Sequence, residues 1–486
     1  MDTNIAYGLM LATLGFFGYV GYQATTEKEL DTDEYLSARG TQSWQRIGLS
    51  LFASGMGIWI LFGPSEVGYW GGFWDVVGYA VSASTPFLLL AYVGPMVREK
   101  LPDGVTLADY VRMRIGRPMQ IYVGIISVTY MFTFLFAEFT AIGKAMFVLS
   151  DMDPIIPMLA VGVVTAGYTA YGGLPASLRT DRIQAWVVLW LVVALLLILF
   201  AGDIGSLISD AKAYNPEGNL DWSIGSMSHM DSFKSGLALV LAITAAEMFS
   251  QGNWQRAWAS EDEEALKKGS LLAAALVLPL VFIMGVLGTV AAAQGAAADP
   301  SAAFFILLED VHVLVIAGFV VLGIALVCSS VDTLQNAVSA SINRDLADGK
   351  MDLKQARIVT VAMIPLAIYL ATGPTIVGFT FDAYSVFGIF LFADLLAAAT
   401  VLPVLLTLWE RIDSRASLAG AVCGLLSVVV YGMYTADLST GIGYITSPTN
   451  ELGLANLEVF LSALIGSGLV TIAGSEILIR SESTVE

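Results

Sequence analysis

Two adjacent serines give the clearest chemical signal in this 486-residue chain. Ser329 and Ser330 stand in an apolar stretch, within the segment 328–333. Adjacent residues of a helix point about 100° apart, so both hydroxyls face one ion only if it lies between this helix and a neighbour. Hard oxygen ligands without a fixed carboxylate suit a weakly held monovalent cation. The alternative is structural, because serines in membrane helices also bond a carbonyl one turn back or allow close packing.

Ionisable side chains inside apolar stretches form a second group. Each costs about 2.5–3.5 kcal/mol to insert into a membrane, so such residues are usually functional. They are Glu138, Lys144, Glu247, Asp332, Asp382 and Asp394. Glu138 and Lys144 lie too far apart round a helix to pair on one face, so each is expected to meet another helix.

Four residues are expected to contact a solute. Glu247 and Gln251 flank an interruption of an apolar stretch, and Glu138 lies in the middle of another stretch. Trp59 is expected in the pocket wall, although tryptophans in membrane helices often simply pack. Buried acceptor oxygens select solutes rich in N–H or O–H donors, such as urea, an amine or an amino acid. The alternative is that both acids are structural and bind loose backbone.

Two apolar segments are interrupted in the middle, at residues 52–60 and 246–254, about 195 residues apart. Each opens a set of five apolar spans, as expected for a transporter built from two repeats. An interrupted helix leaves carbonyls, amides and half-helix ends unpaired near the middle of a bilayer, where an ion and a solute can replace water. The pattern therefore predicts movement of a solute across a membrane.

Composition indicates a membrane protein, because 56% of the residues are hydrophobic and only 13% are charged. An all-α fold with thirteen transmembrane helices is expected, since apolar stretches of about 20 residues cross a bilayer. They lie near residues 5–23, 46–63, 73–97, 121–150, 155–173, 183–202, 233–252, 268–293, 312–342, 356–372, 375–408, 416–435 and 456–479. One domain over 1–486 is expected, with a leading helix and loop at 5–43, repeats at 44–202 and 233–410, and two trailing helices at 411–486.

The distribution of Lys and Arg tests this count, because loops rich in these residues stay in the cytoplasm. With thirteen spans, 20 of the 23 basic residues fall on one side, Arg256 among them. Only Lys212 and Lys234 fall on the other side, and Lys144 lies inside a span. A multi-pass protein of the cell membrane is therefore expected, with its amino terminus outside and its carboxyl terminus in the cytoplasm.

The net charge is −19, which is unusual beside that basic bias. Scattered acids that keep a surface hydrated fit a high-salt habitat, and a basic partner is the alternative. The expected partners are a small-molecule solute and the lipid bilayer; nucleic acid is not expected, and no protein partner is implied. Both cysteines, Cys328 and Cys423, lie in apolar stretches, so no disulfide framework is expected.

Other function classes find less support. The chain has two histidines and contains neither a His-Glu-x-x-His string nor a Gly-x-x-x-x-Gly-Lys-Ser/Thr string, so it is not expected to be an enzyme. A channel is an alternative, because interrupted helices also line pores. An uncoupled or proton-coupled carrier is another.

Several strings together resemble the sodium/solute symporter family in order and spacing, from about residue 5 to residue 410. The more specific strings are Tyr168-Thr169-Ala170-Tyr171-Gly172-Gly173-Leu174, Thr180-Asp181-Arg182-Ile183-Gln184 and the serine pair. The weaker ones are Phe52-Ala53-Ser54-Gly55-Met56 with Gly63-Pro64, Thr106-Leu107-Ala108-Asp109-Tyr110 and Ser250-Gln251-Gly252-Asn253-Trp254.

This resemblance implies a LeuT-like fold of two inverted five-helix repeats, each with a broken first helix, and sodium (Na+) as coupling ion. The implied function is sodium-coupled symport by alternating access. The implied sodium site consists of the carbonyls of Ala53, Met56 and Leu326 and the hydroxyls of Ser329 and Ser330. Asp181, at the cytoplasmic mouth, would meet the departing sodium; a plain loop aspartate is the alternative.

One departure from the family concerns the solute. The branch that transports proline is similar around Ala53 and Ser54 but has an aspartate at the position of Gly55. The absence of that carboxylate argues against proline. The segments 66–68 and 253–256 are closer to the urea-permease branch, a similarity too short to fix the substrate.

Overall fold

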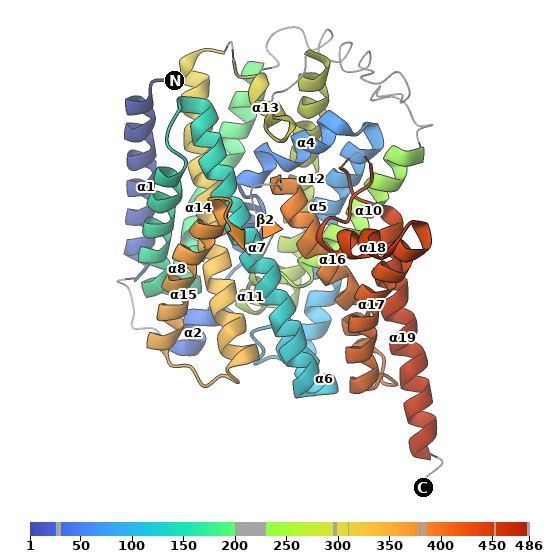
Figure 1. Cartoon of the computed structure of the whole chain (residues 1–486). Coiled ribbons are helices and arrows are strands. Elements are labelled where there is room, and N and C mark those ends of the chain that lie inside the picture. The colour runs from blue at the N-terminus through green and yellow to red at the C-terminus, as the bar shows by residue number, and fades with distance from the viewer. Residues whose placement is uncertain are drawn as a thin grey trace.

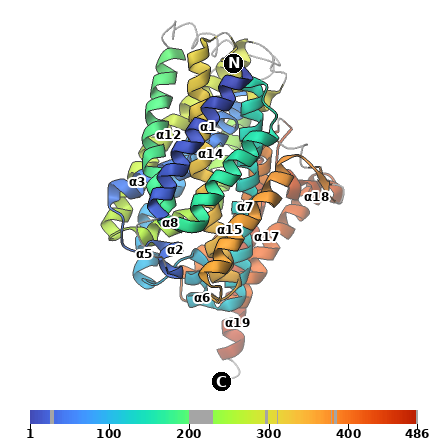
Figure 2. The same ribbon diagram turned by 90° about the vertical axis from the view of Figure 1, so that its left-hand side faces the viewer.

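A computed structural model describes most of the chain, and nearly all of what it describes is helical. The long helices run side by side as one bundle (Figure 1, Figure 2), with the start of the chain and the end of the last helix at opposite ends. Two predictions concern residues outside the described part of the chain. They are Asp382, predicted inside a span, and residues 203–229, predicted in an outer loop. The described residues are 1–25, 31–199, 230–294, 299–309, 311–376, 379–380, 385–451 and 453–483.

Ten helices in this part of the chain are long and apolar enough to cross a membrane. They are α1 (Thr3–Thr25), α5 (Phe73–Lys100), α7 (Arg117–Ser150), α8 (Ile155–Leu199), α12 (Glu263–Gln294), α14 (Val313–Ser341), α15 (Leu353–Ala371), α16 (Val386–Leu405), α17 (Ser414–Thr435) and α19 (Leu457–Ser483). Two bent pairs raise the number to twelve if each pair is one span. The all-α membrane fold is confirmed, and the count of thirteen stays a prediction.

The bent pairs lie where the sequence is interrupted. In the first pair, α3 (Trp44–Gly55) leads through the 3-10 turn η1 (Ile58–Leu61) into α4 (Gly63–Trp70). In the second pair, α10 (Met230–Glu247) leads into α11 (Gln251–Ala259). Each pair is bent by 57°. The predicted break in the first helix of each repeat is therefore confirmed.

The residues of the first break explain it. Met56 leaves the helix at φ −99° and ψ 83°, and Gly57 continues in extended backbone. A Cβ atom on Gly57 would collide with the carboxylate of Glu138, so this close approach requires glycine. Pro64 stands in the first turn of α4, where a missing N–H costs no helical hydrogen bond.

Helix α8 contains a kink where the sequence predicts a loop between the fifth and sixth spans. Residues 174–182 are helical, and the kink is at Gly173, which has a left-handed φ of 55°. A Cβ atom on Gly173 would collide with the ring of Tyr35. Asp181 therefore lies on a helix, fully buried, and the interpretation of it as a loop aspartate is wrong.

Several short elements link the long helices. The eleventh predicted span begins later than expected, because a two-stranded hairpin precedes α16. The short elements are α2 (Thr32–Ser37), α6 (Leu107–Ile115), η2 (Pro300–Ala302), α13 (Ala303–Ile306), the π-helical η3 (Ile342–Leu346), β1 (Thr375–Ile376), β2 (Phe379–Thr380), η5 (Leu406–Leu408) and α18 (Leu438–Thr446). Figure 1 shows α2 and α6 towards the end of the bundle at which α19 ends.

Both breaks lie in the core of the bundle. Helix α14 packs against α3, η1 and α11, and α5 packs against α4, α10 and α11. Helix α16 contacts α4 and α10. The backbone atoms that the breaks leave unpaired are therefore surrounded by helices.

Candidate functional site

A buried ion pair joins α8 to α11. Nη2 of Arg256 lies 2.7 Å from Oδ2 of Asp181, and neither side chain is exposed. Ser50 on α3 donates to Asp181 (2.5 Å) and accepts from Nε of Arg256 (2.8 Å). The sequence predicts Arg256 on the cytoplasmic side, which stays a prediction; Asp181 and Ser50 hold its guanidinium inside the bundle.

The serine pair on α14 adjoins this ion pair. The hydroxyl of Ser329 donates to Oδ1 of Asp181 over 2.7 Å. The hydroxyl of Ser330 is buried and has no hydrogen-bond partner among the described residues. Buried hydroxyls without a partner are uncommon, because leaving one unmatched costs free energy. Ser330 is therefore the serine with an oxygen to spare for a ligand.

The carbonyls expected at the ion lie at the end of α3 and within α14. Ala53, Met56 and Leu326 are buried, and α3 packs against α14. Helix α3 ends at Gly55, and in the described part of the chain no backbone N–H beyond it bonds to the carbonyls of Ala53 or Met56. Carbonyls freed by unwinding are typical ligands of Na+ in transporters. The two carbonyls at the first break therefore fit a monovalent cation chemically, whereas Leu326 lies within the uninterrupted helix α14.

Asp332, another acid of the apolar stretches, is satisfied by hydroxyl groups. Tyr168, Ser177 and Thr180 donate to its carboxylate over 2.6, 2.7 and 3.1 Å. All three donors lie on α8, so Asp332 ties α14 to that helix. These hydrogen bonds explain why an acid can be buried at this position.

A small cavity of about 50 Å³ lies beside the first break. Trp59 and Glu247, two of the residues expected to contact a solute, line it. Its other lining residues are Gly55, Met56, Tyr79, Ala83, Pro86, Phe87, Tyr130, Phe134, Ile243, Phe387, Phe390 and Asp394. Both bent pairs contribute, together with α5, α7 and α16.

Two carboxylates face this cavity. Glu247 accepts from the hydroxyl of Tyr130 (2.6 Å) and from Nδ2 of Asn253 (2.8 Å). Asp394 is 3% exposed, and its Oδ2 has no hydrogen-bond partner among the described residues. The two acids are close enough to repel each other. The sequence signals Asp394 as an acid inside a span, but only the fold brings α16 next to α10 and so adds Asp394 to the site.

Glu138 and Gln251, also expected at the solute, do not line the cavity. The carboxylate of Glu138 accepts from the backbone N–H groups of Ile58 (2.9 Å) and Trp59 (3.2 Å). It therefore caps the half-helix that follows the first break. Gln251 donates to the carbonyl of Val105 and accepts from the N–H of Leu107, so it binds the segment before α6. Both side chains are engaged by backbone in this structure.

Seven of the fourteen residues that line the cavity are aromatic. Trp59 stacks on Tyr79 with ring centroids 5.9 Å apart, and its edge meets Phe390 at 6.3 Å. Phe134 stacks on Phe390 at 4.5 Å. A Cβ atom on Gly55 would lie 2.8 Å from Cζ of Phe87, so a longer side chain there would require Phe87 to move. No sequence pattern identified these rings as neighbours.

Lys144 meets another element, as expected from its spacing to Glu138. Its Nζ lies 3.4 Å from Oδ2 of Asp299 and 3.3 Å from Oγ of Ser301, both in the segment between α12 and α13. Burial alone would raise the pKa of Asp299, but the hydrogen bond from Ser301 and the charge of Lys144 hold that pKa below its usual range. This pair lies apart from the cavity.

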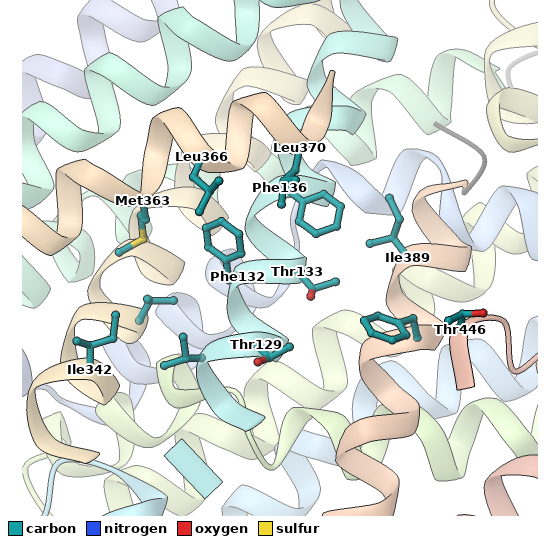
Figure 3. A pocket seen from close by; sticks show the side chains of 13 residues that line it. Thr129, Phe132, Thr133, Phe136, Ile342, Met363, Leu366, Leu370, Ile389 and Thr446 are labelled. Carbon is teal, nitrogen blue, oxygen red and sulfur yellow. The ribbon is translucent and has the colours of Figure 1, made fainter. Parts of the chain in front are cut away.

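A larger cavity, of about 700 Å³, is a poor candidate for a polar solute. Figure 3 shows Phe132 and Phe136 of α7, Leu366 of α15 and Ile389 of α16 around one space. Its polar lining groups are the hydroxyls of threonines, and its described lining residues include no charged side chain. It cannot fix the orientation or charge of a polar ligand.

Comparisons with known proteins agree with this architecture. The model of the sodium:solute symporter family matches residues 35–424. The spermidine transporter DUR31 of Candida albicans is 29% identical over 88% of this chain and 79% of that protein. Sodium/proline symporter 2 of Staphylococcus saprophyticus is 23% identical over 90% of this chain and 88% of its own.

A solved structure supports the fold independently of sequence. The structure of a sodium-coupled sialic acid symporter superposes with a TM-score of 0.77 and covers 97% of each chain. The two sequences are only 14% identical, so this likeness concerns the fold alone. It confirms the LeuT-like inverted-repeat architecture that the sequence predicts.

Proposed function

The chain belongs to the sodium:solute symporter family, and from this premise we propose that it couples sodium entry to uptake of a small nitrogen-containing solute. Members of the family are multi-pass membrane transporters, not enzymes. The observation that carries the proposal is the cavity beside the first break, since both bent pairs contribute to it and two carboxylates face it. We place the protein in the cell membrane, with its amino terminus outside and its acidic surface adapted to high salt.

The proposed sodium ligands are the carbonyls of Ala53, Met56 and Leu326 and the hydroxyls of Ser329 and Ser330. Two observations support this assignment. The hydroxyl of Ser330 has no partner among the described residues, and α3 ends at Gly55, next to the carbonyl of Met56. Asp181 accepts from Ser329 in this structure, so we assign it to the path by which sodium leaves towards the cytoplasm. Sodium would replace the hydrogen bonds that these oxygens lack.

The solute is proposed to be rich in N–H donors, because Glu247 and Asp394 offer acceptors to the cavity. The names of two relatives, a spermidine transporter and a proline symporter, also point to nitrogen-containing solutes. Trp59 would form part of the cavity wall. Glu138 would stabilise the first break through the N–H of Ile58, and Gln251 would connect the second break to Leu107. Bending of the broken helices would open the cavity alternately to each side.

Uptake into proteoliposomes tests this function. We expect radioactive sodium to enter when urea, an amine or an amino acid is supplied outside, and not when acetate, pyruvate or a sugar is supplied. Counterflow of labelled solute should occur, which separates a carrier from a channel. Solute uptake that is independent of sodium, or that follows a proton gradient instead, would refute sodium coupling.

A further inference from the structure

Building on this proposed function, we propose that the solute is a compact organic cation without a carboxylate, bound between Glu247 and Asp394. The cation would carry an ammonium or guanidinium group. Three features of the cavity lead to this assignment: its charge, its aromatic wall and the side chain that occupies the neighbouring half-helix end. Each feature is independent of the sodium ligands.

The charge of the cavity is uncompensated. Glu247 and Asp394 are its only charged lining residues among those described, and no Lys, Arg or His is among its lining residues. Glu247 receives hydrogen bonds from the neutral Tyr130 and Asn253, and Oδ2 of Asp394 receives none from the described residues. A buried carboxylate without a positive partner is strongly unfavourable. A bound cation would supply the missing charge and the missing donors.

The aromatic wall also favours a cation. The faces of aromatic rings are electron-rich and attract cationic groups within about 6 Å, most strongly for Trp and Tyr. Trp59, Tyr79 and Tyr130 line the cavity together with four phenylalanines. Such a wall stabilises an ammonium or guanidinium group after it loses water, and it offers nothing to an anion.

Glu138 excludes a solute carboxylate from the place where it would otherwise bind. The N-terminus of a half-helix binds anions through its free N–H groups, and broken helices of transporters use it to hold anionic parts of substrates. Here Glu138 occupies the N–H groups of Ile58 and Trp59 at that position. An amino acid could bring its ammonium group to Glu247, but its carboxylate would find these donors taken. The solute is therefore a cation without a carboxylate and not an amino acid.

The size of the cavity limits the cation. A cavity of about 150 Å³ holds benzene, and this cavity measures about 50 Å³. A group the size of guanidinium or methylammonium matches that space without movement of the wall. A longer amine requires the aromatic side chains to rearrange.

Guanidinium and urea form a matched pair for the test, because they share size and planar shape and differ in charge. In proteoliposomes with the full chain, we expect guanidinium or methylammonium to drive sodium uptake, and urea and proline to fail at equal concentration. Asp394→Asn should raise the half-saturating concentration of the active cation at least 10-fold. The sodium concentration for half-maximal uptake should change less than twofold, and the exposed control Glu451→Gln should behave as wild type.

Sodium uptake driven by urea or proline but by none of the cations would overturn this assignment and leave sodium-coupled symport intact. No solute-driven sodium uptake with any compound would instead refute the proposed function itself. Wild-type cation affinity in Asp394→Asn would also overturn the role of that residue. If this variant does not fold, as judged by gel filtration, the comparison of cations with urea in the wild type still decides.

Discussion

Three buried acids of this chain differ in the groups that donate hydrogen bonds to their carboxylates. Glu138 is satisfied by two backbone N–H groups at a broken helix, and Asp332 is satisfied by hydroxyls of α8. Asp394 has one oxygen with no partner in the described part of the chain. Acids that the protein satisfies away from the cavity are structural, whereas an acid left unsatisfied beside the cavity indicates a ligand.

The serine pair gives a prediction at this scale. Ser330→Ala removes a hydroxyl without a protein partner, so it should raise the sodium concentration for half-maximal uptake about 10-fold, in line with ~1–3 kcal/mol for an unmet polar group. Ser329→Ala should do the same and should also lower thermal stability, because its hydroxyl binds Asp181. Sodium-dependent uptake of the identified solute measures the first effect.

Solute affinity at saturating sodium serves as the control for both serine variants and should change less. Unaltered sodium dependence in each single variant and in the double variant would assign these hydroxyls to helix packing.

At the scale of helices, the two breaks and the Asp181–Arg256 pair belong together. The ion pair holds α11, the second half of a broken helix, against α8, and Ser50 extends the contact to α3. One buried cluster therefore links α3 and α11, one half of each bent pair. If sodium binds Ser329 as proposed, it would act directly on this cluster, since the Ser329 hydroxyl donates to the same carboxylate.

Removing one partner of this pair should destabilise the protein strongly. Arg256→Gln leaves Asp181 charged and uncompensated, which costs about 3–5 kcal/mol in other proteins. We expect a clear fall in the thermal unfolding temperature of the detergent-solubilised protein, with partial recovery in the double variant Asp181→Asn, Arg256→Gln. The control is Arg411→Gln, because Arg411 is 69% exposed and lies 4.0 Å from Glu476, and such surface pairs contribute little. Equal shifts for the two arginine variants would contradict this account.

At the scale of the whole molecule, the structure fixes which segments share an end of the bundle. The N-terminal amine donates to the carbonyl of Leu149, so the start of the chain and the end of α7 lie together. Arg112 of α6 pairs with Asp348, which places the segment before α15 beside α6. This ion pair lies at the opposite end of the bundle from the N-terminus. The hydrogen bond that Arg112 donates keeps the pKa of Asp348 below its usual range.

The predicted orientation follows from the excess of Lys and Arg on one side. In a variant with Cys328 and Cys423 replaced by alanine, Asp153→Cys should react with an impermeant thiol reagent in intact cells. Lys350→Cys should react only after the membrane is permeabilised. Because both side chains are exposed, any difference in labelling reports which side of the membrane each residue faces. The reverse pattern would invert the topology and exclude the cytoplasmic assignment of the Asp181 path.

The sequence by itself determined the features that depend on local chemistry. Apolar stretches set the helices, Gly57 and the adjoining residues set the first break, and the motif strings identified the family. These features are readable because each depends on residues that are near one another in the chain. The kink at Gly173 was misread as a loop, because a glycine with a following proline signals an interruption without stating its length.

Only the tertiary structure decided how the distant polar groups are paired. It shows the guanidinium of Arg256 paired in the core, Glu138 capping the half-helix after the first break, and Asp394 beside the same cavity as Glu247. The sequence marks Glu138, Glu247 and Asp394 as costly inside a membrane, but the group that each of them meets lies on another helix. Which helix that is depends on packing across the whole bundle, and no local pattern encodes it.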